Sequence, residues 1–437
     1  MTRNVLFTSL IAAAALGCSQ NAGVASSGTS SASSEAVACA QDTGLKLPDG
    51  FCATIFADSV GAVRHMAVSS GGDLIANMQN AGRNSVVAAV KSGQVALRDN
   101  DRNGRADVIQ RFGTSGGTGI AIYKDYVYAD VGRAIVRYRI NWSDLRPSGS
   151  VDTVVADIPG PPGHQARNFE IAGDGTMYVN FGSATNACQV KDRSAGSKGV
   201  DPCAELETRA GIWKFSADKL KQRPSSANRY ATGLRNAVAL RLGPGRQLYS
   251  VVQGRDQLFG NWSPMFTEQQ NAELPAEIMV AINQGDDFGW PYCYYDGIRR
   301  VSVLAPEYGG DGKIPGRCTT KKNPILGLPA HWSPIDLLFY KGSQFPAKYR
   351  NGVFVTFHGS WNRAPLPQAG YNVVFVPFVN GVPSPNFEIF ADNFTTILEP
   401  ARAEHRPAGL AQAPDGSLYI SYDTGGRIWK ITYSGAR

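Results

Sequence analysis

A short pattern recurs six times along the chain, in which turn residues are followed by an alternating apolar or aromatic segment. The copies begin at Gly71, Lys124, Asp174, Gly245, Arg350 and Asp415. Most copies are followed by a second alternating segment, at residues 134–140, 211–217, 277–283, 371–378 and 427–433. Alternation with a period of two between turn residues predicts β-strands joined as antiparallel hairpins.

Six antiparallel units with almost no helical periodicity between them predict an all-β fold, a six-bladed β-propeller. The widest gap lies between the fourth and fifth copies, so we expect long loops from that region to cover one face. Residues 50–58 precede the first copy. We expect them to close the ring by pairing with the last blade, because closure removes an exposed sheet edge. The unequal spacing leaves a pair of β-sandwiches as the alternative.

The first 40 residues carry export signals. An apolar run over residues 5–16 follows Arg3 and is shorter than the roughly 20 residues that span a bilayer, which predicts a signal peptide over residues 1–17. The run ends at Cys18 in a sequence that resembles the cleavage box of bacterial lipoproteins; ordinary signal cleavage nearby is the alternative. Residues 18–40, rich in Ser, Ala and Gly, are expected to form the lipoprotein anchor and a flexible linker. We therefore expect residues 41–437 to form the propeller, in the periplasm and lipid-anchored to the outer membrane.

Composition narrows the class further. With 43% hydrophobic residues, 18% charged residues, 48 Gly and 25 Pro, the chain suits a turn-rich globular protein better than a disordered or coiled-coil one. The run over residues 5–16 is the only long apolar run in the chain, which excludes a polytopic membrane protein. The net charge of +7 comes from basic residues scattered singly, which argues against nucleic acid as a partner and leaves a small anionic ligand possible.

The cysteines favour disulfides. Seven are present, and setting Cys18 aside leaves an even number in an oxidising compartment. Sequence alone leaves the connectivity open, and we favour the local pairing because each bond would close a short loop. The expected pairs are Cys39 with Cys52, Cys188 with Cys203, and Cys293 with Cys318. None of the six has the CxxC spacing of a zinc or redox site.

The candidate chemistry lies in loops beside the predicted strands. His164, one of five histidines, stands just upstream of the third copy, where an imidazole could accept a proton near neutral pH; a solvated loop histidine is the alternative. Equivalent strand ends of a propeller converge on its axis, so arginines in such loops would face one volume and, without nearby acids, bind an anion. Separate surface salt bridges are the alternative. The residues concerned are Arg64, Arg235, Arg363 and Arg406.

Five segments in order resemble one family. They are Gly163-His164, Gly233 to Asn236 (GLRN), Phe288 to Cys293 (FGWPYC), His358 to Arg363 (HGSWNR) and Arg406-Pro407. Together they resemble the sorbosone dehydrogenase-like branch of the pyrroloquinoline quinone (PQQ) dehydrogenases, which is related to soluble quinoprotein glucose dehydrogenase. The likeness runs from about residue 47 to residue 433.

The resemblance implies roles for these residues. His164 would remove the hydroxyl proton of a sugar while hydride passes to the quinone, and Arg235 with Asn236 would hold the quinone oxygens. PQQ is planar and carries three carboxylates, which suits several arginines around one pocket. The residues expected to bind the cofactor, from the loop positions and the resemblance together, are Arg64, Arg235, Asn236, His358, Trp361, Asn362, Arg363 and Arg406.

Two places are expected to bind calcium. The resemblance assigns one ion to the backbone carbonyls of Gly254 and Arg255, although the glucose enzymes have proline where this chain has Arg255. The second is an acidic loop whose oxygen-bearing residues have the spacing that wraps calcium, without the bidentate glutamate at its end. Its residues are Asp99, Asp101, Asn103 and Asp107. An Asx-rich turn is the alternative there.

The leading hypothesis is a PQQ- and calcium-dependent dehydrogenase that oxidises a hydroxyl or hydrated aldehyde of a sugar-like substrate. It would pass electrons to a cytochrome or quinone and would touch the membrane only through Cys18. A calcium-dependent propeller hydrolase of the lactonase type and a non-catalytic propeller that binds glycans or protein are the alternatives.

Overall fold

The computed structural model describes residues 39, 42–79, 92–399 and 402–435, which belong to one unit of the chain, Ala36–Arg437. The predicted signal peptide, the lipidation site at Cys18 and the linker up to residue 38 lie outside the described residues. No helix in the described part of the chain combines the length and apolar character needed to cross a membrane.

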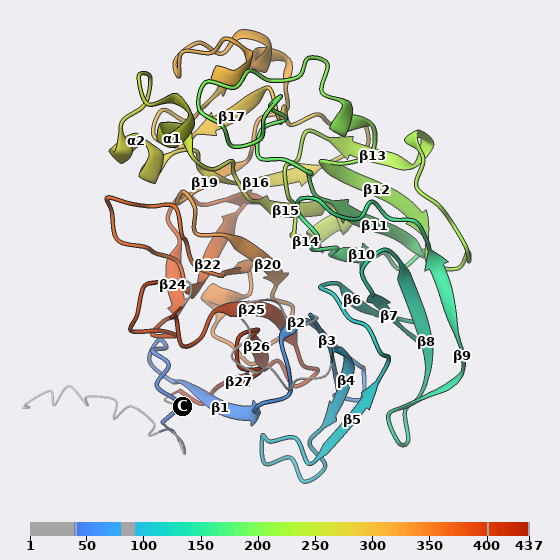
Figure 1. The fold of residues 1–437 in the computed structure, drawn as a ribbon. Helices are drawn as coiled ribbons and strands as arrows, with labels where there is room; N and C mark the ends of the chain where they lie inside the picture. Colours follow the sequence, from blue (N-terminus) through green and yellow to red (C-terminus); the bar gives the residue numbers. More distant parts are fainter. Residues whose placement is uncertain (1–38, 40–41, 80–91, 400–401, 436–437) are drawn as a thin grey trace, which may run out of the picture. The chain divides into compact units, whose positions relative to one another are not determined.

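Six antiparallel sheets of four or five strands form the blades of the fold in the described residues (Figure 1). Their innermost strands are β2 (Val63–Val68), β6 (Ile120–Tyr123), β10 (Phe169–Ile171), β14 (Ala239–Leu242), β20 (Pro334–Phe339) and β25 (Pro407–Gln412). The second strands are β3 (Leu74–Met78), β7 (Tyr126–Asp130), β11 (Thr176–Phe181), β15 (Leu248–Val252), β21 (Gly352–Phe357) and β26 (Leu418–Tyr422). The third strands are β4 (Gly93–Arg98), β8 (Ile135–Asn141), β12 (Gly211–Ser216), β16 (Glu277–Ile282), β22 (Asn372–Val379) and β27 (Ile428–Tyr433).

The outermost strands complete each blade. They are β5 (Val108–Phe112), β9 (Arg146–Val155), β13 (Arg229–Thr232), β19 (Leu326–Leu328), β23 (Val382–Pro383) with β24 (Glu388–Ala391), and β1 (Phe51–Ala57). Strand β1 pairs antiparallel with β27, with Phe51 opposite Tyr433, so the N-terminal strand completes the last blade. This confirms the predicted closure of the ring.

The innermost strands contact one another in sequence order, and β25 contacts β2, so the six blades surround a common axis. This arrangement confirms the six-bladed propeller and excludes the pair of sandwiches. The six sequence copies are the second strands of the blades. Apolar side chains fill the spaces between blades; between the fifth and sixth blades, for example, Phe51, Phe345, Phe354 and Phe390 pack with ring centroids 4.7 to 6.2 Å apart.

The widest gap between copies holds an insertion in the fourth blade. Helices α1 (Leu258–Trp262) and α2 (Glu268–Glu273) lie between β15 and β16, and the hairpin of β17 (Cys293–Asp296) and β18 (Val301–Leu304) lies between β16 and β19. Trp290 Nε1 donates to the Asn186 carbonyl at 3.0 Å. The insertion thus packs against the loop that follows β11, as expected for long loops covering one face.

All three predicted disulfides are present. Cys39 pairs with Cys52, Cys188 with Cys203, and Cys293 with Cys318.

Candidate active site at one end of the propeller axis

The candidate residues lie at the end of the propeller where the innermost strands begin and the second strands end. His164, Asn236 and Arg406 precede β10, β14 and β25, whereas Gln253 and His358 follow β15 and β21. The two sets meet because the first two strands of each blade run antiparallel.

Hydrogen bonds connect this end from the fourth blade to the sixth. Asn236 Nδ2 donates to Gln253 Oε1 at 2.8 Å, and Gln253 Nε2 donates to Ser333 Oγ at 3.0 Å. The backbone N–H of His358 donates to the Ser333 carbonyl at 2.9 Å, and Arg406 Nε donates to the His358 carbonyl at 2.9 Å. Residues that are distant in the sequence therefore surround one end of the axis.

His164 lies half-buried at this end. Its Nδ1 is 3.0 Å from the Ser183 carbonyl oxygen and 3.1 Å from Ser183 Oγ, while Arg167 Nη1 donates to the His164 carbonyl at 2.7 Å. Burial, with the positive charge of Arg235, lowers the pKa of His164 to about 3. The imidazole is therefore neutral near pH 7 and can accept a proton.

The guanidinium of Arg235 is buried, and four of its five N–H groups donate to protein oxygens. Nη1 donates to the Gly254 carbonyl at 2.7 Å, Nε donates to the Asn186 carbonyl at 3.2 Å, and Nη2 lies 3.0 Å from both Asn186 Oδ1 and Asp256 Oδ2. Burial lowers the pKa of Arg235, because water no longer stabilises its charge. This side chain presents a fixed positive charge beside His164.

Two carboxylates lie among the arginines, so the prediction that these arginines have no nearby acids was wrong. Asp256 pairs with Arg235 and, at 2.9 Å, with Arg193. Asp423 pairs with Arg64 at 2.5 Å and accepts a hydrogen bond from His358 Nε2 at 2.9 Å. Both acids follow second strands, β15 and β26, and that position is the signal that could have revealed them.

The Asp423 group has a defined charge state. Burial lowers the pKa of His358 to about 4, so this histidine is neutral and donates to an anionic Asp423. Burial alone would raise the pKa of Asp423, but the hydrogen bond from His358 and the charges of Arg64 and Arg406 lower it. The pair is therefore a hydrogen bond between a neutral imidazole and a carboxylate.

The side chains of Trp361, Asn362 and Arg363 have different surroundings. Trp361 is 54% exposed, and the Arg193 guanidinium lies 5.9 Å from the centre of its ring. Asn362 Nδ2 is buried and has no hydrogen-bond partner among the described residues. Arg363 Nη1 donates to the carbonyls of Ala272 and Ala330, each at 3.0 Å. Arg363 therefore joins two loops instead of leaving its donors free for a ligand.

The loop that the resemblance assigns to calcium is held from both sides. The Gly254 N–H donates to Glu277 Oε2 at 2.7 Å, and burial raises the pKa of Glu277 to about 7. The Arg255 guanidinium is buried against Glu307, with 2.5 Å between Nη1 and Oε2. The side chain of Arg255 is thus directed into the insertion, and only its backbone could serve the calcium site.

The second candidate calcium loop lies between β4 and β5, on the outer part of the first blade. Carboxylate oxygens of Asp99, Asp101 and Asp107 lie within 4.8 Å of one another. The backbone N–H of Asn103 donates to Asp99 and to Asp101, each at 3.1 Å, as in Asx turns. The arrangement suits both interpretations, and calcium in this loop stays a prediction.

The fold places the chain among closed six-bladed propellers. One axial end holds a neutral imidazole and buried arginines, so the site there is polar and compatible with an anionic ligand. Within that class, the chain belongs to the TrAA12-like family, whose model matches residues 45–434.

Two curated relatives match parts of the chain. The PQQ-dependent pyranose dehydrogenase of Coprinopsis cinerea is 29% identical over 285 residues, covering 54% of this chain and 36% of that protein. An uncharacterized protein of Borreliella burgdorferi is 30% identical over 206 residues, covering 46% of this chain and 48% of that protein. The chain thus spans less than half the length of either relative.

Solved structures share the fold. A Trichoderma reesei carbohydrate-active enzyme of family AA12 superposes with a TM-score of 0.72 at 20% identity, covering 90% of this chain and 98% of that one. The holo PQQ domain of Coprinopsis cinerea pyranose dehydrogenase gives a TM-score of 0.71 at 19% identity, with the same coverage.

Proposed function

We propose that this protein is a PQQ- and calcium-dependent dehydrogenase that oxidises a hydroxyl or hydrated aldehyde of a sugar, with pyranoses as the favoured class. The observation that carries the proposal is the neutral imidazole of His164 held beside the charge of Arg235. Membership of the TrAA12-like family and the printed name of the Coprinopsis relative support it.

The residues at the axial end fit a planar, triply acidic cofactor. Arg64 is buried, and its Nε has no hydrogen-bond partner among the described residues; the same holds for Asn362 Nδ2. Unsatisfied buried donors are costly, so an oxygen-rich anion would find partners here. Arg406 lies close enough to Arg64 for their charges to interact, and burial lowers the pKa of Arg406, which indicates a charge that a bound anion would stabilise.

The chain's own groups suit proton and charge handling. When bound, PQQ would supply the two-electron acceptor for hydride, which the side chains lack. His164 Nε2 would accept the hydroxyl proton of the sugar as the carbon–hydrogen bond breaks. Arg235 and Asn236 would donate hydrogen bonds where negative charge develops on the acceptor oxygens.

Calcium fits the same end, held by the Gly254 and Arg255 carbonyls. A carbonyl oxygen has two lone pairs, so Gly254 can accept from Arg235 and still face an ion. The carboxylate of Asp256 supplies negative charge next to the same loop. Oxygen atoms of this kind are the ligands that calcium prefers, and the ion would act there as a Lewis acid.

Export and electron transfer complete the proposal. We assign the protein to the periplasm with a lipid anchor on Cys18, and a cytochrome or quinone as electron acceptor. Three disulfides among the described cysteines support an oxidising compartment.

The test is sugar oxidation by purified protein reconstituted with PQQ and calcium, measured by dye reduction and by the absorption spectrum of the bound quinone before and after each pyranose. We expect both signals, and we expect neither from His164→Ala carrying PQQ. Absence of cofactor uptake and of oxidation across a broad sugar panel would reject the proposal.

Lactone hydrolysis that survives PQQ removal but not chelation would favour the hydrolase. Glycan binding that is unaffected by His164→Ala, without turnover, would favour the binding module.

A further inference from the structure

We infer that Ser183, Thr185 and Glu205 form a hydrogen-bonded relay that fixes His164 in the tautomer with its proton on Nδ1. In this arrangement Ser183 is a positioning residue and His164 Nε2 is the free base. The catalytic meaning rests on the proposed function, whereas the tautomer itself does not.

The first step is that Ser183 presents only acceptors to the imidazole. Its carbonyl oxygen lies 3.0 Å from His164 Nδ1 and its Oγ lies 3.1 Å away. The hydroxyl proton of Ser183 is committed elsewhere, because Oγ donates to the Thr185 carbonyl at 2.7 Å. Two acceptors facing Nδ1 require a proton on that nitrogen, which leaves the lone pair on Nε2.

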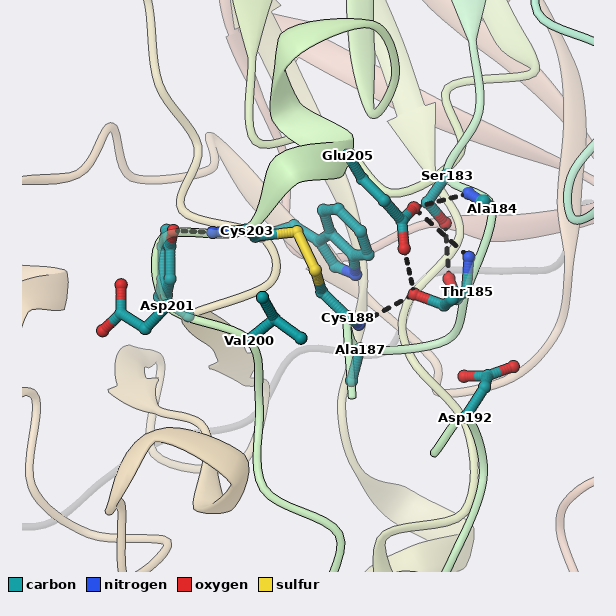
Figure 2. The surroundings of a disulfide bond; sticks show 12 residues. Ser183, Ala184, Thr185, Ala187, Cys188, Asp192, Val200, Asp201, Cys203 and Glu205 are labelled. Carbon is teal, nitrogen blue, oxygen red and sulfur yellow. Dashed lines mark hydrogen bonds between the residues drawn. A yellow bond between two sulfur atoms is a disulfide. The ribbon is translucent and has the colours of Figure 1, made fainter. Parts of the chain in front are cut away.

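The second step is that Glu205 holds the segment carrying Ser183 and Thr185 in place. Figure 2 shows its carboxylate directed at the backbone of Ala184 and Thr185. Glu205 Oε2 accepts from the N–H of Ala184 at 2.6 Å and from the N–H of Thr185 at 3.3 Å, and Oε1 accepts from Thr185 Oγ1. All the groups facing Glu205 are donors, so only a carboxylate satisfies every one of them.

The third step is covalent. Cys203 precedes the 3₁₀ helix Ala204–Glu207, which carries Glu205, and it is bonded to Cys188, whose N–H donates to Thr185 Oγ1 at 2.8 Å. The disulfide therefore ties the segment with the carboxylate to the segment with its donors (Figure 2). Ser183 itself is fully buried, so its hydroxyl is shielded from competing water.

The tautomer can be read directly in the protein without cofactor. Nitrogen-15 NMR of protein labelled at histidine distinguishes a protonated from a bare ring nitrogen, and His164→Ala identifies the signal among the five histidines. We expect His164 to show a protonated Nδ1 and a bare Nε2 near pH 7.

The decisive variant is Glu205→Gln, which keeps the shape but turns one acceptor into a donor. We expect a mixture of tautomers in the NMR spectrum and a fall in kcat of about tenfold or more, with PQQ affinity and sugar KM within about twofold of wild type. Glu207→Gln is the matched control, because Glu207 lies on the same 3₁₀ helix with an exposed side chain and faces Arg229 at 3.7 Å. It should leave tautomer and kcat unchanged.

A bare Nδ1 on His164 in the wild type would overturn the inference, as would a native tautomer and native kcat in Glu205→Gln. If Glu205→Gln does not fold, Thr185→Val removes the Oγ1 contacts at nearly the same volume and should shift the tautomer signal in the same direction; no shift there overturns the relay. A correct tautomer in a wild-type protein that oxidises no sugar would instead reject the proposed function and leave the relay intact.

Discussion

Arg235 donates a hydrogen bond to the carbonyl oxygen of Gly254, with 2.7 Å between Nη1 and that oxygen. A guanidinium therefore occupies one side of the carbonyl that is proposed to hold calcium. The second lone pair of this oxygen is free for the ion, but two positive charges close together repel, so Arg235 should weaken calcium binding here.

We predict that Arg235→Gln binds calcium more tightly than the wild type in the absence of PQQ, by about tenfold or more, because the repelling charge is gone. The loaded variant should nevertheless lose kcat by roughly 10²–10³-fold, because a donor to the developing charge is weakened. Calorimetric titration with calcium and steady-state kinetics measure the two effects.

Arg193→Gln is the control for this prediction, since Arg193 pairs with the same Asp256 without contacting Gly254. Equal gains in calcium affinity for the two variants would show that the charge near Asp256 matters and that the Gly254 carbonyl is no ligand.

The pKa of His164 predicts the pH dependence of turnover. Since that pKa is lowered to about 3, the base is already neutral well below pH 5, and kcat/KM should show no acid limb from this group between about pH 5 and 8. His164→Gln should lower kcat roughly 10²–10⁴-fold while PQQ still binds. An acid limb near the ordinary value of 6.5 that disappears in His164→Gln would contradict the lowered pKa.

The same shift links His164 to stability. In the unfolded chain the pKa returns to 6.5, so between about pH 3 and pH 6.5 the unfolded state binds more protons than the folded state. The free energy of unfolding should therefore fall as the pH falls through this window. Denaturant unfolding at several pH values should show a shallower fall for His164→Gln than for the wild type.

The second strands of the blades could be predicted from sequence, because they are short runs rich in apolar and aromatic residues that follow turn residues, and in the structure they are buried almost throughout. The innermost strands could not, because polar residues that pair across the axis interrupt their alternation. Arg241 on β14 lies 3.1 Å from Asp336 on β20 and 3.6 Å from Glu170 on β10. Only the closed ring brings these charges together, and no local pattern signals it.

The candidate site likewise contains residues that could be predicted from sequence and residues that could not. His164, Arg235 and Asn236 were predictable because each stands just before an innermost strand, where a propeller converges. The pairing of Arg64 was not predictable: the place of Asp423 after a second strand indicates an acid at this end, but Asp423 lies 359 positions further along the chain and meets Arg64 only through ring closure. The acceptors around His164 were equally hidden, since Ser183 sits after a second strand in a segment without a motif.

We predict that Asp423→Asn destabilises the protein without cofactor by about 3 kcal/mol, because it leaves the charge of Arg64 buried and unpaired. PQQ should recover much of this loss by supplying a carboxylate to Arg64. Thermal unfolding with and without PQQ measures both changes. Asp218→Asn is the control: its partner Lys124 is exposed, so the change should cost far less stability and the cost should not depend on PQQ. Equal PQQ-induced increases in the unfolding temperature of wild type and Asp423→Asn would show that Arg64 does not bind the cofactor.

Two disulfides close loops of similar length, and comparing them distinguishes an effect on stability from an effect on catalysis. Cys188–Cys203 closes a loop of 15 residues beside Ser183, whereas Cys39–Cys52 closes one of 13 residues at the N-terminal strand. Replacing either pair by alanine should cost about 3 kcal/mol, because similar loops constrain the unfolded chain similarly. Only the Cys188–Cys203 variant should also lose kcat, because Thr185 and Glu205 lose their covalent tie. Chemical unfolding gives the first quantity and dye-linked sugar oxidation the second. If the two double variants lose kcat equally, the Cys188–Cys203 disulfide contributes to folding and has no separate effect on catalysis.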